Sequence, residues 1–276
     1  MPTYLSPGIY TRETDFSFYV KQISTSSAAM VGVAEKGPIN KPVLVTSWEQ
    51  FINRFGSYIN ESYLAYAARA FFDNGGSVLY VTRIAHLTDP TDRDTLTALK
   101  SSIVLQNREA TPADALRIEA VNEGVWGDRL SVSIEDGSLD PANHFNLVVR
   151  HKGDVVEVFK DLSMDETLPN HVELAINDRS DFILVQDLAA ATGTPGDRPA
   201  LGVFTLTGGD NGLTDLADAD FIGDPSQHTG LYGFDEIDAL NLLMVPGVTT
   251  VPVINAGIAY TEARKDLLFI ADTPMH

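Results

Sequence analysis

The segment LLMVPGVTTVPVINAGIAYTEARKDLLFIA, residues 242–271, decides the fold of this 276-residue chain. It predicts a buried strand over residues 242–245, a turn, a helix over residues 251–265 and a second buried strand over residues 267–271. A strand, a crossover helix and another strand at this spacing form a βαβ unit, whose two strands run parallel. The segment therefore predicts an α/β sheet.

A second α/β pattern occurs near the N-terminus. The strands predicted there are residues 28–34, 42–46 and 77–84. Ser47 and Gln50 have the spacing of a helix capping box, and the helix that follows is predicted to end at Gly56. Another predicted helix ends at residues 74–76. Residues 77–84 are apolar on both faces, which is typical of a central strand in a covered sheet.

The pattern between these two regions is mainly β. The alternating stretches are residues 115–121, 130–134, 145–150 and 155–159. The last two are separated by the turn residues 152–154 and are predicted to form a hairpin. Short helices are predicted over residues 96–102 and 166–177.

These patterns predict an α/β chain, α+β overall, with three parts. Residues 1–24 contain helix-breaking Pro and Gly and are predicted to be an extended N-terminal arm, which is either a frayed terminus or a strand that docks onto something else. Residues 25–88 and 207–276 are predicted to form one discontinuous α/β domain. Residues 89–206 are predicted to form a β-rich domain inserted into it.

Charge restricts the partners. Lys and Arg total 19 and Asp and Glu total 38, so the formal net charge is −19. Binding to a phosphate backbone needs clustered cations, which argues against nucleic acid as a partner. No run of about 18 apolar residues occurs, which argues against membrane insertion. Cysteine is absent, which excludes disulfides and thiolate chemistry.

The acidity is concentrated in one region, because residues 199–263 contain no Lys or Arg. The candidate acidic contact surface there consists of Asp210, Asp215, Asp218 and Asp220. One interpretation is a solvated face that keeps the protein soluble. The other is a surface that meets a basic partner or a basic patch on another copy.

Motifs for catalysis and cofactors are not found. The glycine-rich residues 208–212 fit neither the dinucleotide nor the phosphate-loop pattern, and the nearby Asp residues lack the spacing of an EF-hand. No His lies in a zinc-protease motif, and no G-x-S-x-G elbow occurs. We therefore predict no catalytic, cofactor or metal site.

Motifs in the same order along nearly the whole chain resemble the contractile tail sheath proteins of myophages and related injection machines. The matching stretches are PGIYTRE at 7–13, SAAMVGVAEKGP at 27–38, PVLVTSW at 42–48, FINRFG at 51–56, YLAYA at 63–67, FFDNGG at 71–76, GVWGDRL at 124–130, LTGGDNG at 206–212, GL at 230–231 and NLLMVPG at 241–247. Asp128 stands where the family has Asn.

The resemblance implies a structural role. Sheath subunits stack as hexameric rings in a helical array around an inner tail tube protein, between baseplate and tail terminator proteins. Arms add strands to the sheets of neighbouring copies, and contraction drives the tube through a target envelope. The arm residues implied here are Pro7, Gly8, Ile9, Tyr10, Arg12 and Glu13. The implied location is the virion tail, with assembly in the host cytoplasm.

The resemblance also implies that a C-terminal region of the family is missing after His276. The chain is then a fragment or a natural short form, and by itself is expected to be a monomer or weakly associated. A receptor- or carbohydrate-binding accessory domain is the second interpretation, with the β-rich insert as the binding module. An enzyme that uses part of the Asp cluster is the third.

Overall fold

The computed structural model describes residues 27–188 and 197–274, which form three sheets. The five-stranded sheet has the order β12-β11-β1-β3-β2. Its strands are β1 (Ser27–Gly32), β2 (Val43–Val45), β3 (Val78–Arg83), β11 (Leu242–Met244) and β12 (Leu268–Ile270). The neighbours from β12 to β3 are parallel, and β2 joins β3 antiparallel. The mixed α/β class predicted from the sequence is confirmed.

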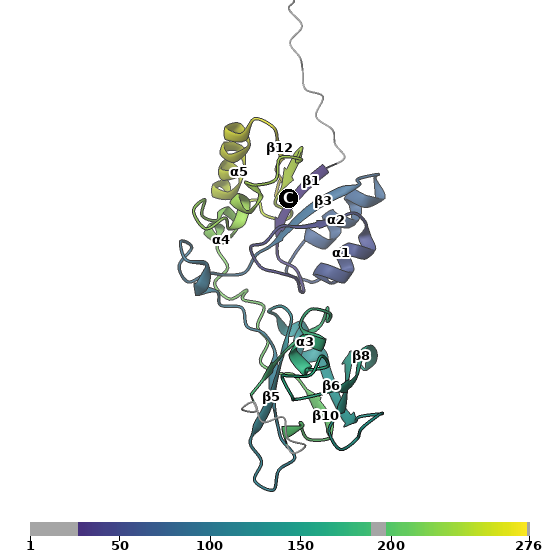
Figure 1. The fold of residues 1–276 in the computed structure, drawn as a ribbon. Helices are drawn as coiled ribbons and strands as arrows, with labels where there is room; N and C mark the ends of the chain where they lie inside the picture. The colour runs from purple at the N-terminus through teal and green to yellow at the C-terminus, as the bar shows by residue number, and fades with distance from the viewer. Residues whose placement is uncertain (1–26, 189–196, 275–276) are drawn as a thin grey trace, which may run out of the picture.

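The predicted βαβ unit is present as β11, α5 (Val251–Arg264) and β12, but β12 is largely exposed rather than buried as predicted, because it is an edge strand. Pro252 lies in the first turn of α5, where its missing amide proton costs nothing. β1 is buried along its whole length, because it lies in the middle of the sheet and has helices over both faces. Figure 1 shows α1 and α2 on one side of this sheet and α5 on the other.

Two helices follow from local sequence. α1 (Trp48–Phe55) begins at Ser47, whose hydroxyl accepts the Gln50 amide proton at 3.2 Å. The Gln50 side chain accepts from the Thr46 amide at 2.9 Å and not from Ser47, so the predicted capping box is only half formed. α2 is Leu64–Asp73.

The other two sheets are antiparallel. One has the order β10-β6-β7-β8, and the other has the order β4-β5-β9. Their strands are β4 (Ser102–Gln106), β5 (Asp114–Ala120), β6 (Leu130–Asp136), β7 (Phe145–His151), β8 (Asp154–Leu162), β9 (Ile183–Asp187) and β10 (Gly202–Thr205). The predicted hairpin is β7–β8, in which Lys152 and Gly153 both have positive φ.

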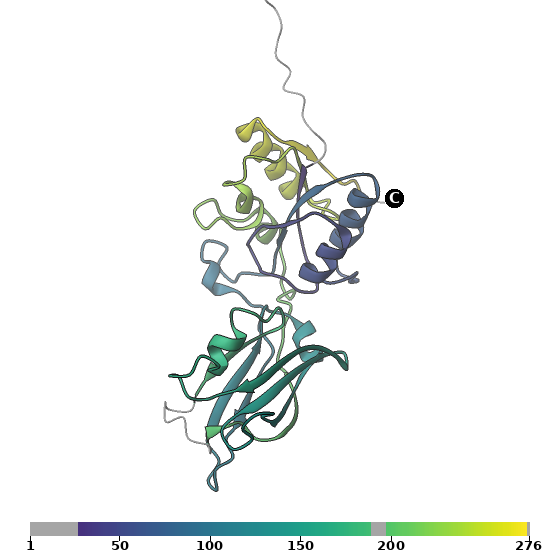
Figure 2. The ribbon, with the colours of Figure 1, turned by 45° about the vertical axis from the view of Figure 1, so that its right-hand side comes forward.

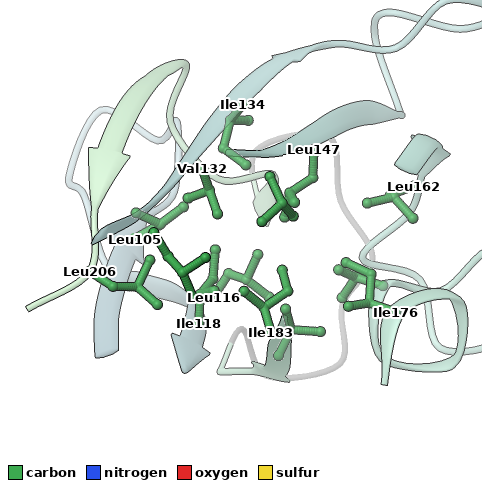
Figure 3. Close-up of a cluster of buried hydrophobic side chains, with 14 of the residues drawn as sticks. Leu105, Leu116, Ile118, Val132, Ile134, Leu147, Leu162, Ile176, Ile183 and Leu206 are labelled. Atoms are coloured by element: carbon green, nitrogen blue, oxygen red, sulfur yellow. The ribbon is translucent and has the colours of Figure 1, made fainter. Parts of the chain in front are cut away.

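One hydrophobic core lies between these two sheets. Ile118 from β5, Val132 from β6 and Leu147 from β7 point into it (Figure 3). α3 (Val172–Ile176) closes one end of this core with Ile176. The five-stranded sheet has two further clusters of buried residues, one on each face.

The helix predicted over residues 96–102 is wrong. Leu99 donates and accepts backbone hydrogen bonds with Asp210, each 3.0 Å long, and Ser102 begins β4. The helix predicted over residues 166–177 is present only as α3. The remaining short elements are α4 (Asp218–Ile222), η1 (Arg93–Thr95), η2 (Val125–Arg129) and η4 (Gly230–Phe234).

The sheets divide between two lobes (Figures 1 and 2). The α/β lobe is built on the five-stranded sheet, and the β lobe contains strands β4 to β10. The chain crosses between them after β3 and returns after β10. Paired backbone hydrogen bonds from Leu99 to Asp210 and from Ser102 to Thr207 hold the two crossing segments side by side.

Candidate assembly surfaces

The predicted inter-subunit arm lies outside the described residues and stays a prediction. Its members are Pro7, Gly8, Ile9, Tyr10, Arg12 and Glu13.

Three of the four predicted acidic residues have side chains that reach solvent. Asp210 is exposed on the returning crossing segment, and its carboxylate accepts the Gly212 amide proton at 2.7 Å. Asp215 is exposed at a position with φ of 62°. Asp218 is half-buried and accepts from the Thr250 hydroxyl at 2.7 Å.

The prediction that Asp220 belongs to the acidic contact surface is corrected, because this residue is buried and only 4% exposed. It occupies the third position of α4, and its carboxylate accepts the amide protons of Ala217 and Leu87, both at 2.9 Å. The His86 imidazole lies 3.0 Å from the same carboxylate. Asp220 therefore ties α4 to the segment after β3 and cannot belong to a contact surface.

Arg83 is buried at the junction of the lobes. Its guanidinium donates to the Gly37 carbonyl at 2.9 Å and to the Glu123 carbonyl at 2.8 Å, one in each lobe. The side chain is 0% exposed, and its Nε and Nη2 atoms have no hydrogen-bond partner among the described residues. Burial lowers the pKa of Arg83 to about 10, so the group keeps its charge at neutral pH.

The loop before Gly37 adds two contacts across the junction. Glu35 accepts from the Arg129 guanidinium at 3.0 Å. The Lys36 amino group lies 5.5 Å from the Trp126 ring centroid and 5.4 Å from that of Phe182. Burial lowers the pKa of Lys36. This loop holds the β lobe with an ion pair and a cation–π contact.

Lys36→Met is expected to lower the free energy of unfolding by about 1 kcal/mol, because Met keeps the apolar stem but removes the cation above two rings. Lys160→Met is the control, since Lys160 is exposed on β8. Urea denaturation measures both. Equal stabilities for the two variants would contradict a role for the Lys36 charge.

Two glycine-rich stretches meet at the same junction. The Val125 amide donates to the Asn211 side chain at 3.0 Å, and the Gly209 amide donates to Asp128 at 3.0 Å. A Cβ on Gly209 would lie 2.4 Å from the Gly124 carbonyl oxygen, so only glycine fits there. Residues 124–130 and 206–212 therefore form one packed unit.

The junction is also hollowed. A groove of about 810 Å³ and a smaller cavity of about 260 Å³ are both lined by Pro38, Val121 and Asn122. In the two described ranges, no group of three His, Asp or Glu residues could hold a metal ion. No helix in these ranges is long and apolar enough to cross a membrane.

The five-stranded sheet has two edge strands among the described residues, β2 and β12, and β12 has apolar side chains on an open face. Phe269 faces α5, where a Cβ on Gly257 would lie 2.5 Å from its ring. Leu268 and Ile270 point to the other face and are 54% and 41% exposed. An edge strand with apolar residues on an open face is a template for another strand.

Comparison with known proteins gives a consistent result. The model of the tail sheath protein Gp18 domain III N-terminal region matches residues 25–84. The tail sheath protein of Vibrio phage KVP40 is 28% identical over 220 residues, which are 78% of this chain and 27% of that protein. These findings support the contractile tail sheath family. The family-model match begins before β1 and ends after β3, so it covers the first half of the α/β lobe.

Solved sheath structures show the same fold. The sheath tail protein from Listeria innocua aligns with a TM-score of 0.59 at 12% identity, over 87% of this chain and 45% of its own. The one from Desulfitobacterium hafniense aligns at 0.54 and 13% identity, over 96% of this chain and 56% of its own. The chain thus spans about a quarter of its curated sheath relative and about half of each solved sheath structure.

Sequence reasoning missed Arg83 and Lys36. Arg83 ends an otherwise apolar strand, where a charged residue normally marks the surface. Lys36 lies beside a Gly-Pro turn, which indicates a loop and gives no sign of the rings above it. The signal in the sequence was the pair of glycine-rich sheath motifs at residues 124–130 and 206–212, because two such motifs that pack closely together mark a junction.

Proposed function

We propose that the chain is a structural subunit of a contractile tail sheath. Copies polymerise around an inner tube, and contraction of the lattice drives that tube through a target cell envelope. The observation that carries the proposal is the agreement of a family model, a curated relative and two solved folds on sheath proteins. Because the chain spans only part of these relatives, the activity of the whole assembly remains part of the proposal.

Strand addition between copies is the proposed means of assembly. The arm residues 7–13 contain β-prone residues after a Pro-Gly turn. The β12 edge, which pairs with no further strand within residues 27–188 and 197–274 and has exposed Leu268 and Ile270, supplies the kind of surface onto which an extended segment can pair. Main-chain hydrogen bonds of this kind join subunits and tolerate changes of lattice pitch.

The two lobes are proposed to be separate domains, with residues 89–206 inserted into a domain of residues 25–88 and 207–276. The distinct hydrophobic clusters support this division, because every described residue of one cluster lies within residues 103–206. Rigid lobes suit a lattice that changes shape by repacking its subunits.

The proposed partners are other sheath subunits in stacked hexameric rings, the inner tail tube protein, and baseplate and terminator proteins. The proposed location is the virion tail, after assembly in the host cytoplasm. Nucleic acid is not a proposed partner, since the net charge is −19. We propose no catalytic role, in line with a structural family.

The receptor- or carbohydrate-binding alternative needs aromatic side chains on the surface of the β lobe. Trp126, the only Trp in the insert, is buried. The large exposed apolar side chains within the described part of the β lobe are all aliphatic, such as Leu139 and Val203. Sheath assembly is therefore the better-supported proposal.

Negative-stain electron microscopy of the full-length gene product tests this function. The proposal predicts hollow tubes built of stacked six-fold rings. Particles that remain single at all concentrations, together with specific retention on a glycan array, would favour the accessory-domain alternative.

A further inference from the structure

The smaller cavity at the lobe junction is basic, in a chain with a net charge of −19. Lys41, Arg93 and Lys100 line its 260 Å³, and Glu123 is the one carboxylate among the described residues of its lining. The first comes from the loop after β1, and the other two come from the segment that crosses to the β lobe. Three of the chain's 19 cations therefore converge on one small hollow.

Within the part of the chain that the structure describes, these cations have no carboxylate partner of their own. Among the described residues, the side chains of Lys41, Arg93 and Lys100 form no hydrogen bond or ion pair. Asp92, which neighbours Arg93, accepts the Asp94 amide proton at 3.0 Å and so caps the η1 turn. Two amide side chains, Asn40 and Asn122, add neutral polar groups to the lining. The site is suited to an anion with few atoms.

A carboxylate side chain fits this description better than a polyanion. The cavity is too small for a phosphate backbone, and the net charge of the chain repels one at long range. A carboxylate can still pair with the cations at short range, because at physiological salt the repulsion from the rest of the chain is screened beyond about 8 Å. A partner that offers carboxylates without competing cations is required.

The chain itself contains such a segment. Residues 199–263 have no Lys or Arg, and Glu236 and Asp238 lie exposed on the loop between η4 and β11. Within the described ranges these two carboxylates form no hydrogen bond or ion pair. Asp235, beside them, already accepts from the Tyr260 hydroxyl at 2.9 Å.

We infer that the Lys41–Arg93–Lys100 cavity of one copy binds Glu236 and Asp238 of a second copy. This heterologous contact rests on the proposed sheath function and names one of its subunit interfaces. A head-to-tail contact of this kind propagates through a lattice, because every copy presents both a cavity and an acidic loop.

Charge reversal in the full-length gene product tests the contact. The cavity variant is Lys41→Glu with Lys100→Glu, and the loop variant is Glu236→Lys with Asp238→Lys. Each alone is expected to raise the protein concentration needed for tubes by about tenfold or more. A 1:1 mixture, or all four changes in one chain, restores opposite charges and is expected to recover assembly.

Lys160→Glu with Arg179→Glu is the matched control, since it makes the same charge change at exposed residues away from the cavity. Circular dichroism verifies that each variant is folded. Normal assembly of the cavity variant, or failure of the four-change variant to recover, overturns this contact and leaves the sheath function standing. Absence of tubes from the wild type would instead overturn the sheath function.

A further experiment uses inorganic phosphate as a probe of the cavity. Titration calorimetry on the wild type and the cavity variant measures whether the site takes a free anion. If phosphate competes for the cavity and raises the protein concentration that the wild type needs to form tubes, the contact is supported. Phosphate binding that leaves assembly unchanged identifies a site for a free anion and overturns it.

Discussion

Arg83→Ala is expected to lower the free energy of unfolding by about 3 kcal/mol or more. The substitution removes the donor to the buried Gly37 carbonyl and to the partly buried Glu123 carbonyl, and it opens a cavity where a fully buried side chain lay. Because these carbonyls belong to different lobes, the substitution mainly weakens the contact between the lobes. Urea denaturation of the variant should show two transitions, one for each lobe.

Two further variants separate the causes. Arg83→Met retains most of the volume and removes a buried charge whose Nε and Nη2 have no partner in the described part of the chain, so it is expected to recover about half of the loss. Arg117→Ala removes an exposed arginine paired with Glu119 at 3.6 Å and is expected to change stability by less than about 0.5 kcal/mol. If Arg83→Ala behaves like Arg117→Ala, Arg83 does not join the lobes.

Removal of residues 1–24 is expected to abolish tube formation by the full-length gene product. The deletion removes no residue of the described sheets and core clusters, which start at Ser27. The thermal unfolding midpoint should therefore stay at the wild-type value. Electron microscopy and sedimentation measure assembly, and differential scanning calorimetry measures the midpoint.

A single substitution tests the same arm more narrowly. Ile9→Pro removes one backbone N–H that strand addition would use, whereas Ile9→Thr keeps it and has high β propensity. We expect the proline variant to lose tubes and the threonine variant to form them. Tubes from the deletion variant, or equal behaviour of both Ile9 variants, would show that the arm does not join copies.

The sequence predicted the parallel part of the fold well. The β11–α5–β12 unit could be predicted because a strand followed by a crossover helix leaves few alternatives. The β7–β8 hairpin was equally predictable, since Lys152 and Gly153 adopt the positive φ that a two-residue turn requires. In both cases the controlling interactions are local.

The failures have long-range causes. Leu96 and Leu99 have helical spacing, but the backbone of Leu99 pairs with Asp210, more than 100 residues away. Asp220 belongs to an acidic run typical of a surface, yet its position in α4 turns the carboxylate inward to the amides of Leu87 and Ala217 and to the His86 ring. Periodicity and charge runs contain no information about such partners.

The junction was hidden for the same reason. Lys36 and Arg83 are ordinary loop and strand-end residues in the sequence, and only the fold brings Trp126 and Glu123 to them. The sheath motifs at residues 124–130 and 206–212 mark the place but do not reveal the contact. The contacts at the junction could therefore be found only once the packing of both lobes was known.

The central claim is that copies of this chain lend backbone strands to one another in a tubular jacket. A helical reconstruction by electron cryomicroscopy of tubes formed by the full-length gene product tests it most directly. The account predicts that residues 7–13 run as a strand hydrogen-bonded to a sheet of a neighbouring copy. Density in which those residues fold back onto their own subunit, with copies touching only through side chains, would contradict it.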